Sequence, residues 1–137
     1  MIYLDTNVII SVMDERDPNY TIAKEFVMKK IKEKKVISQL TKVELSSVYA
    51  RGGINDPQAF AIYSIKKIGA ELIKADFDQV FLEAFKLSSK IKLRTLDLLH
   101  ISICKIYNIN KFLTFDKNII SKQEILEEIG IKLITPD

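Results

Sequence analysis

The chain is poor in the residue types on which several familiar kinds of site depend. Its 137 residues include one cysteine, one histidine, four glycines and no tryptophan. The single Cys104 excludes an internal disulfide, which fits a reducing compartment. Cys104 and His100 together are too few soft ligands for a tetrahedral zinc site. The glycines do not have the spacing of a Walker or Rossmann phosphate loop, and the sequence contains no nucleophile elbow.

Long hydrophobic runs are also missing. Charged residues interrupt every apolar run before it reaches the length that a bilayer span requires, and no signal-peptide pattern opens the chain. The hydrophobic fraction of 47% nevertheless predicts a globular protein with a proper core. A length of 137 residues predicts a single domain, covering residues 1–137. We therefore expect a soluble, cytoplasmic protein that does not contact a membrane.

Short apolar runs alternate with longer amphipathic stretches along the chain. The short runs predict strands at 2–5, 36–39, 71–74, 112–115 and 131–134. The amphipathic stretches predict one helix directly after the first strand and others at 20–35, 42–51, 57–68, 77–91, 96–107 and 118–129. Strands that alternate with helices are typical of a parallel sheet. The predicted fold is α/β, a three-layer sandwich with a central parallel sheet of about five strands flanked by helices.

Two aspartates stand where predicted strands end and helices begin. Asp5 follows the first apolar run, and Asp116 follows the fourth. In open α/β sheets, ligands bind outside the carboxyl ends of the strands, where the strand order reverses. Glu44 and Asp97 lie near the starts of two further helices, so we expect all four carboxylates to share one cleft. A ligand set made only of oxygens suits Mg²⁺ or Mn²⁺.

Each acid also has a purely structural explanation. Asp5 and Asp116 precede helices, where aspartate is a common N-cap. Glu44 comes three residues after Thr41, which matches a capping box. Asp97 falls in a first helical turn, where negative charge interacts favourably with the helix dipole. Taken singly, each acid favours the structural explanation, and only the four together favour a metal site.

The remaining candidates favour less specific interpretations. His100, one turn beyond Asp97 in an apolar helix, is interpreted as structural, and Cys104 as a small core residue. The net charge of +3 implies a more positive surface once four acids are assigned to one cleft. The basic residues fit solvated helix faces, but a basic rim would also suit a polyanion held by its phosphates. They include Lys29, Lys30, Lys32, Lys34, Lys35, Lys66, Lys67, Lys90, Lys92 and Arg94.

Four segments of the sequence carry a family resemblance. They are residues 2–10 (IYLDTNVII), 41–45 (TKVEL), 95–101 (TLDLLHI) and 113–118 (LTFDKN). In this order and spacing, they resemble the motifs of PIN-domain ribonucleases, and within them the VapC toxins of toxin–antitoxin pairs. The resemblance spans nearly the whole chain.

The resemblance implies roles for residues at the matching positions. Asp5, Glu44, Asp97 and Asp116 would be the catalytic, metal-binding acids, and Thr6, Asn7 and Thr114 would support them by hydrogen bonds. One departure lies in the fourth motif, where relatives often have an acid followed by an aromatic residue. This chain has Asn118 and Ile119 there, which implies fewer bound metals but leaves the four acids intact.

The activity implied by the resemblance is hydrolysis of RNA phosphodiester bonds with Mg²⁺ or Mn²⁺. The implied partners are an RNA substrate, a cognate antitoxin protein and a second copy of the chain in a homodimer. Two alternatives stay open: an RNA-processing PIN nuclease without a toxin role, and a catalytically inert PIN-like module that binds RNA. An inert module has no reason to retain all four acids.

Overall fold

A parallel sheet forms the middle layer of the molecule. The computed structural model describes residues 1–136. Within them the sheet has five strands, in the order β3-β2-β1-β4-β5, and every neighbouring pair is parallel. The strands are β1 (Ile2–Leu4), β2 (Lys35–Ser38), β3 (Glu71–Ile73), β4 (Lys111–Leu113) and β5 (Lys132–Ile134). All five predicted strands and the three-layer arrangement are confirmed.

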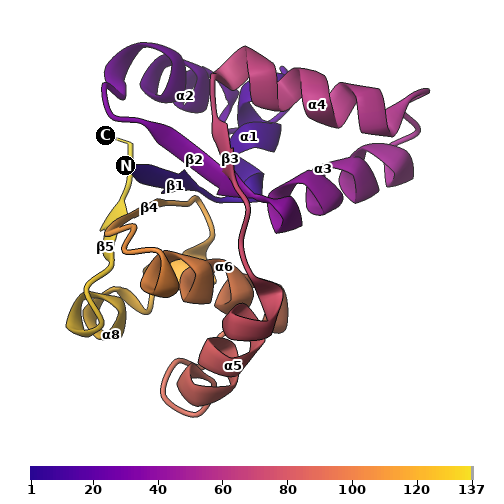
Figure 1. Cartoon of the computed structure of the whole chain (residues 1–137). Coiled ribbons are helices and arrows are strands. Elements are labelled where there is room, and N and C mark those ends of the chain that lie inside the picture. Colours follow the sequence, from indigo (N-terminus) through magenta and orange to yellow (C-terminus); the bar gives the residue numbers. More distant parts are fainter. Residues whose placement is uncertain (137) are drawn as a thin grey trace.

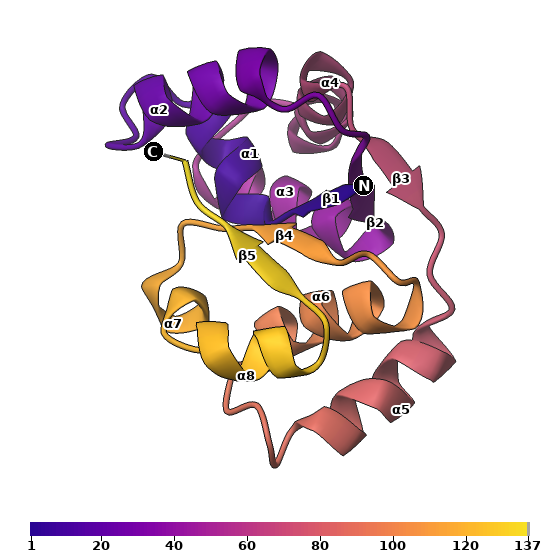
Figure 2. The ribbon, with the colours of Figure 1, turned by 90° about the vertical axis from the view of Figure 1, so that its left-hand side faces the viewer.

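Helices cover both faces of this sheet (Figures 1 and 2). One face carries α1 (Thr6–Met13), α2 (Tyr20–Glu25) with its π-helical continuation η1 (Phe26–Lys30), α3 (Gln39–Arg51) and α4 (Pro57–Ile68). The other face carries α5 (Phe77–Leu87), α6 (Thr95–Ile106), α7 (Lys117–Ile120) and α8 (Gln123–Glu128). The chain changes sides after β3, which places β1 beside β4 at the reversal of strand order.

The alternation of side chains along β1 divides the core in two. Ile2 and Leu4 are buried with the helices of one face, whereas Tyr3 is buried with those of the other. Tyr3 stacks on Phe112 of β4 with ring centroids 5.6 Å apart. Successive side chains of a strand point to opposite faces, so three residues are enough to anchor β1 in both layers.

The ends of several helices differ from the prediction, and side-chain hydrogen bonds account for two of the differences. The helix predicted at 77–91 ends at Leu87, where the Ser88 hydroxyl donates to the Phe85 carbonyl. The helix predicted at 118–129 is divided into α7 and α8, and the Ser121 hydroxyl donates to the Asn118 carbonyl at the break. Serine side chains compete for backbone groups in this way and weaken the continuing helix.

The helix predicted at 20–35 ends at Lys30 instead. Ile31 has extended backbone, and Lys35 is already paired with Ile2 in the sheet. The chain has to leave the helix early to reach this register. Within residues 1–136, no helix is long and apolar enough to cross a membrane.

Candidate functional site

Asp5 is the acid most firmly held by the fold. Its side chain is buried and caps α1, because Oδ1 accepts a hydrogen bond of 2.8 Å from the Thr6 amide. Oδ2 accepts hydrogen bonds from the Thr114 hydroxyl at 2.8 Å and from the Asn7 amide group at 3.1 Å. The Asp5 backbone amide donates to the Leu113 carbonyl, which ties the end of β1 to β4. The expected N-cap is therefore present, with the carboxylate oriented from several sides.

Thr6, Asn7 and Thr114 form a connected group around this carboxylate. Asn7 contacts Thr114 through its amide nitrogen at 3.4 Å and accepts from the Phe115 amide at 3.3 Å. The Thr114 hydroxyl oxygen accepts from the Asp116 amide at 3.0 Å. Asp116 in turn caps α7 through a 2.8 Å bond from the Asn118 amide. These bonds bring the first and fourth sequence motifs together at one edge of the sheet.

Glu44 reaches the same edge from α3. The structural alternative for Glu44, a capping box with Thr41, does not form, because the helix predicted at 42–51 already begins at Gln39. Ser38 is the N-cap, and its backbone amide donates to the Thr41 hydroxyl at 3.4 Å. The Glu44 carboxylate is thereby left for other partners, and its Oε1 accepts from the Thr6 hydroxyl at 2.7 Å and pairs with His100 Nε2.

Asp97 stands in the first turn of α6, as expected, and an arginine lies between it and Asp116. The Arg94 guanidinium is 3.9 Å from Asp97 Oδ2 and 3.6 Å from Asp116 Oδ2. The Arg94 side chain is 77% exposed, whereas the two carboxylates are 16% and 19% exposed. An exposed cation thus balances part of the charge of two partly buried acids.

The pKa values reflect the closeness of the acids. Burial and the neighbouring charges of Asp5 and Asp116 raise the pKa of Asp97 to about 6. Burial raises the pKa of Asp5 too, although His100 and the Thr114 hydroxyl oppose this change. Burial acts on Glu44 in the same direction, but hydrogen bonds from His100 and Thr6 outweigh it and hold the pKa of Glu44 below its ordinary value. The four carboxylates therefore influence one another electrostatically.

The donor atoms of the four acids are of the kind that binds Mg²⁺ or Mn²⁺. Within residues 1–136, no three His, Cys, Asp or Glu side chains are drawn tightly enough together to hold a metal ion. Mg²⁺ does not need such a cage, because it usually keeps several waters and binds through one or two carboxylates together with substrate phosphates. The carboxylates supply oxygen donors, and the raised pKa of Asp97 is a sign of negative charge that a cation would relieve.

Sequence reasoning missed Tyr3 at this site and understated Arg94 and His100. Tyr3 contacts His100, Arg94 approaches Asp116, and His100 does more than fill the core, since it pairs with Glu44. Arg94 could have been recognised from its spacing of three residues before Asp97 on a helix. Nothing in an apolar strand distinguishes Tyr3 from an ordinary core residue.

Comparison with known proteins identifies the family. The family model described as the PIN domain matches residues 2–125. The chain belongs to the PIN-domain family. No curated protein matches the sequence of this PIN domain.

Solved structures with the same fold come from toxin–antitoxin pairs. VapC20 of Mycobacterium tuberculosis, described as a toxin that cleaves the sarcin–ricin loop, has a TM-score of 0.72 and 14% identity over 88% of this chain and 94% of that one. VapBC-1 of nontypeable Haemophilus influenzae has a TM-score of 0.65 and 22% identity over 98% of each chain. VapBC2 of Rickettsia felis, bound to a DNA fragment from its promoter, has a TM-score of 0.68 and 17% identity over 100% of both chains. At these identities, the likeness shows a shared fold.

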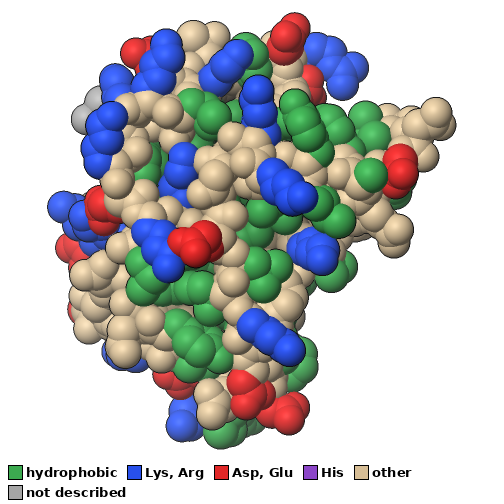
Figure 3. All heavy atoms as spheres, turned by 45° about the horizontal axis from the view of Figure 1, so that its top comes forward, with side chains coloured by type: hydrophobic (Ala, Val, Ile, Leu, Met, Phe, Trp, Pro, Cys, Tyr) green, Lys and Arg blue, Asp and Glu red, His purple; other side chains and the backbone are tan. Residues whose placement is uncertain are grey.

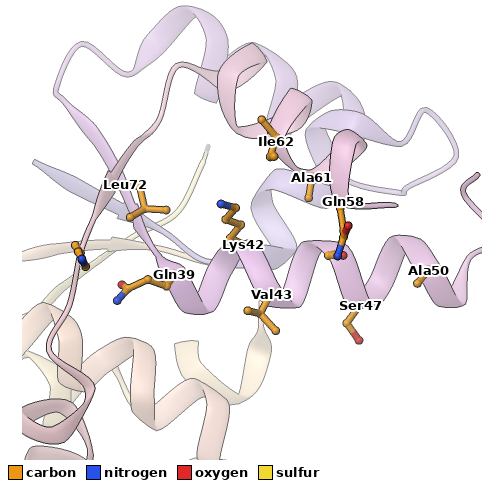
Figure 4. Close-up of a pocket in the computed structure, with 11 residues that line it drawn as sticks. Gln39, Lys42, Val43, Ser47, Ala50, Gln58, Ala61, Ile62 and Leu72 are labelled. Carbon is orange, nitrogen blue, oxygen red and sulfur yellow. The ribbon is translucent and has the colours of Figure 1, made fainter. Parts of the chain in front are cut away.

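A separate groove lies between α3, α4 and β3 of this PIN domain (Figure 4). Its volume is about 830 Å³, and its apolar lining includes Val43, Ile62 and Leu72, which are 66%, 41% and 42% exposed. Lys42 and Lys74 also line it, and among residues 1–136 no acidic side chain does. Figure 3 shows Lys and Arg side chains spread between apolar patches on one face of the molecule. This groove does not contain the four acids.

We expect Asp97→Asn to stabilise the metal-free protein at neutral pH. A raised acid pKa contributes stability below the unfolded pKa of about 4, and that contribution is lost as the pH rises through the folded value of about 6. Asparagine cannot ionise, so the variant should gain on the order of 1–2 kcal/mol at pH about 7.5, after allowance for solvent screening. The gain should vanish near pH 4.

Differential scanning calorimetry in EDTA across this pH range measures the effect. Asp76→Asn is the matched control, because Asp76 caps α5 outside the acidic cluster. A lower melting temperature for Asp97→Asn at neutral pH would show that the carboxylate supports α6 more than it suffers from repulsion.

Proposed function

We propose that this PIN domain is a metal-dependent endoribonuclease and the toxin of a VapBC-type toxin–antitoxin pair. The observation that carries the proposal is the meeting of Asp5, Glu44, Asp97 and Asp116 at one sheet edge. These four acids come from four separate segments of the chain. Capping alone would explain each acid locally, but it would not require them to lie within reach of one another's charge.

The solved neighbours support the toxin part of the proposal. One of them is described as a toxin that cleaves the sarcin–ricin loop, and another as a toxin–antitoxin complex from Klebsiella pneumoniae. A processing nuclease without a toxin role has the same chemistry and is the second candidate. An inert RNA-binding module is disfavoured, because it would gain nothing from a set of mutually repelling carboxylates.

In the proposed reaction, Asp5, Glu44, Asp97 and Asp116 would hold Mg²⁺ or Mn²⁺. The ion would supply activation of a water molecule and positive charge beside the phosphate. The protein contributes position: Thr6, Asn7 and Thr114 fix the Asp5 carboxylate before the substrate arrives. The exposed Arg94 is free to exchange its carboxylate partners for a phosphate oxygen of the RNA.

We expect Asp5→Asn to reduce RNA cleavage by at least about 100-fold, because loss of one metal-binding charge removes several kcal/mol of transition-state stabilisation. Wild-type cleavage should require Mg²⁺ or Mn²⁺ and stop in EDTA. Denaturing gels of a labelled single-stranded RNA measure the rates. Asp56→Asn, which changes the N-cap of α4 only, should cleave normally. Undiminished cleavage in EDTA or by Asp5→Asn would refute the metal-nuclease proposal.

The groove between α3, α4 and β3 is where we expect the antitoxin to dock. Val43, Ile62 and Leu72 offer apolar surface, and Lys42 and Lys74 add positive charge. Figure 4 places Lys42 between the two helices and Leu72 on the neighbouring strand. An amphipathic segment with acidic residues would complement this surface.

Expression of the protein should arrest growth, and co-expression of the antitoxin should restore it. Val43→Asp should keep the toxicity and lose the rescue, because it places a charge in the apolar lining of the groove. Colony counts with and without antitoxin measure both effects. Ile22→Asp, on an exposed position of α2 outside the groove, is the matched control and should still be rescued. Normal growth with abundant, RNA-cleaving protein would favour the processing nuclease.

A homodimer is the assembly we expect, and α5 supplies a surface for it. Phe81, Leu82 and Phe85 are 56%, 58% and 79% exposed on this helix. Three large apolar side chains on one exposed helix are costly to leave in water and typical of a protein interface.

The double variant Phe81→Ser/Phe85→Ser should convert the dimer to a monomer, since aromatic anchors carry much of an interface's binding energy. Light scattering coupled to size-exclusion chromatography gives the mass directly. Lys86→Ser, on the same helix, should remain dimeric. A wild-type protein that elutes with the monomer mass would exclude the dimer, and a dimeric double variant would exclude α5 as its interface.

A further inference from the structure

Two buried side chains, Tyr3 and His100, connect the core to Glu44 through successive hydrogen bonds. The Tyr3 hydroxyl lies 2.6 Å from His100 Nδ1, and His100 Nε2 lies 2.5 Å from Glu44 Oε1. Tyr3 and His100 are 0% and 1% exposed, so neither side chain can exchange these partners for water. Buried polar atoms require a partner, and here both ring nitrogens of His100 have one.

The donor and acceptor in each of these hydrogen bonds can be assigned by starting from the Tyr3 hydroxyl. A tyrosine phenol carries its proton at neutral pH and can donate one hydrogen bond. Ser38 Oγ lies 2.8 Å from the phenol oxygen and can donate to it, which leaves the phenol hydrogen for His100 Nδ1. A histidine that accepts at Nδ1 carries its hydrogen on Nε2, the atom that faces Glu44.

The two hydrogen bonds to Glu44 both go to one oxygen. Oε1 accepts from Thr6 Oγ1 at 2.7 Å and pairs with His100 Nε2, whereas within residues 1–136 Oε2 accepts no hydrogen bond. The carboxylate is 22% exposed, so the second oxygen is accessible. Two donors on one oxygen fix the plane of the carboxylate and leave the other oxygen for a cation.

We propose that His100 is a positioning residue that holds Glu44 in its metal-binding orientation, and that Tyr3 in turn holds His100. The inference rests on the proposed function, in which Glu44 is a metal ligand. Groups that hydrogen-bond to a ligand carboxylate orient it and tune its affinity for the ion. His100 does not contact the ion or the substrate in this role. It acts only through Glu44.

The alternative is that His100 merely fills space in the core. His100→Gln and His100→Leu separate these roles, because their side chains have similar volume but only glutamine has an amide. The amide nitrogen can donate to Glu44, and the amide oxygen can accept from the Tyr3 hydroxyl. A packing role predicts that both variants behave alike, whereas a positioning role predicts that glutamine rescues the function and leucine does not.

The test is Mn²⁺ binding without RNA, measured by calorimetric titration of the full chain at neutral pH. We expect His100→Leu to weaken binding by about 10- to 100-fold, and His100→Gln to stay within a few-fold of the wild type. Tyr3→Phe keeps the stacked ring and removes the hydroxyl that contacts both His100 and Ser38, so it should weaken binding by about 2- to 10-fold. Ile103→Val, a buried change on the same helix, should leave the affinity unchanged.

Each outcome supports or overturns the inference. Wild-type affinity in His100→Leu, or equal losses in the glutamine and leucine variants, would overturn it. If His100→Leu does not fold, Tyr3→Phe decides the matter, and an unchanged affinity there is a refutation. A wild type that does not bind Mn²⁺ would overturn the metal site as well. A wild type that binds Mn²⁺ but leaves RNA intact would overturn only the nuclease proposal, with the positioning role still measurable.

Discussion

Mutual repulsion among carboxylates at the ends of β1 and β4 is the constraint on which the site depends. Asp5 is nearly buried, and its charge acts on Asp97 and is itself affected by Glu44. Such a cluster would be expelled to water unless other groups held it. The fold provides these groups as hydroxyls, amides and a helix start around Asp5, and as Arg94 on the exposed side. The same features that make the acids tolerable also hold them in fixed directions.

The topology of the sheet makes this gathering possible. The side-chain bond from Thr114 to Asp5 joins residues 109 positions apart in sequence, because the reversal of strand order places β1 beside β4. β1 also delivers Tyr3 to the opposite core layer, where it meets His100. A strand of three residues therefore supports Asp5 at its end and, through Tyr3, the histidine that pairs with Glu44 of α3.

Much of the fold could be predicted from the sequence, because its signals are local. The strand and helix order followed from periodicity, and the helix predicted at 57–68 has those bounds in α4. The helix ends were less predictable. Lys30 ends its helix because Lys35 must pair with Ile2, and that pairing is a property of the sheet.

In the site too, features set by neighbouring residues could be predicted, and contacts between residues far apart in sequence could not. The sequence placed Asp5, Asp97 and Asp116 correctly at strand ends or helix starts. It left a capping box with Thr41 open as an alternative for Glu44, because spacing alone cannot show that Ser38 already starts the helix. The bond from His100 to Glu44 joins residues 56 positions apart, and no local pattern could reveal it.

The fastening of α3 at its first turn has a consequence for how the molecule opens. Tyr3 contacts Ser38 at 2.8 Å, and Ser38 and Thr41 fix the beginning of the helix that carries Glu44. The first turn of a helix normally frays, and its amides exchange with solvent through small local openings. Here that turn is attached to a central strand, so we expect it to fray less than a free helix end. Glu44, one turn further along, would then keep its position through the local openings that loosen other helix ends.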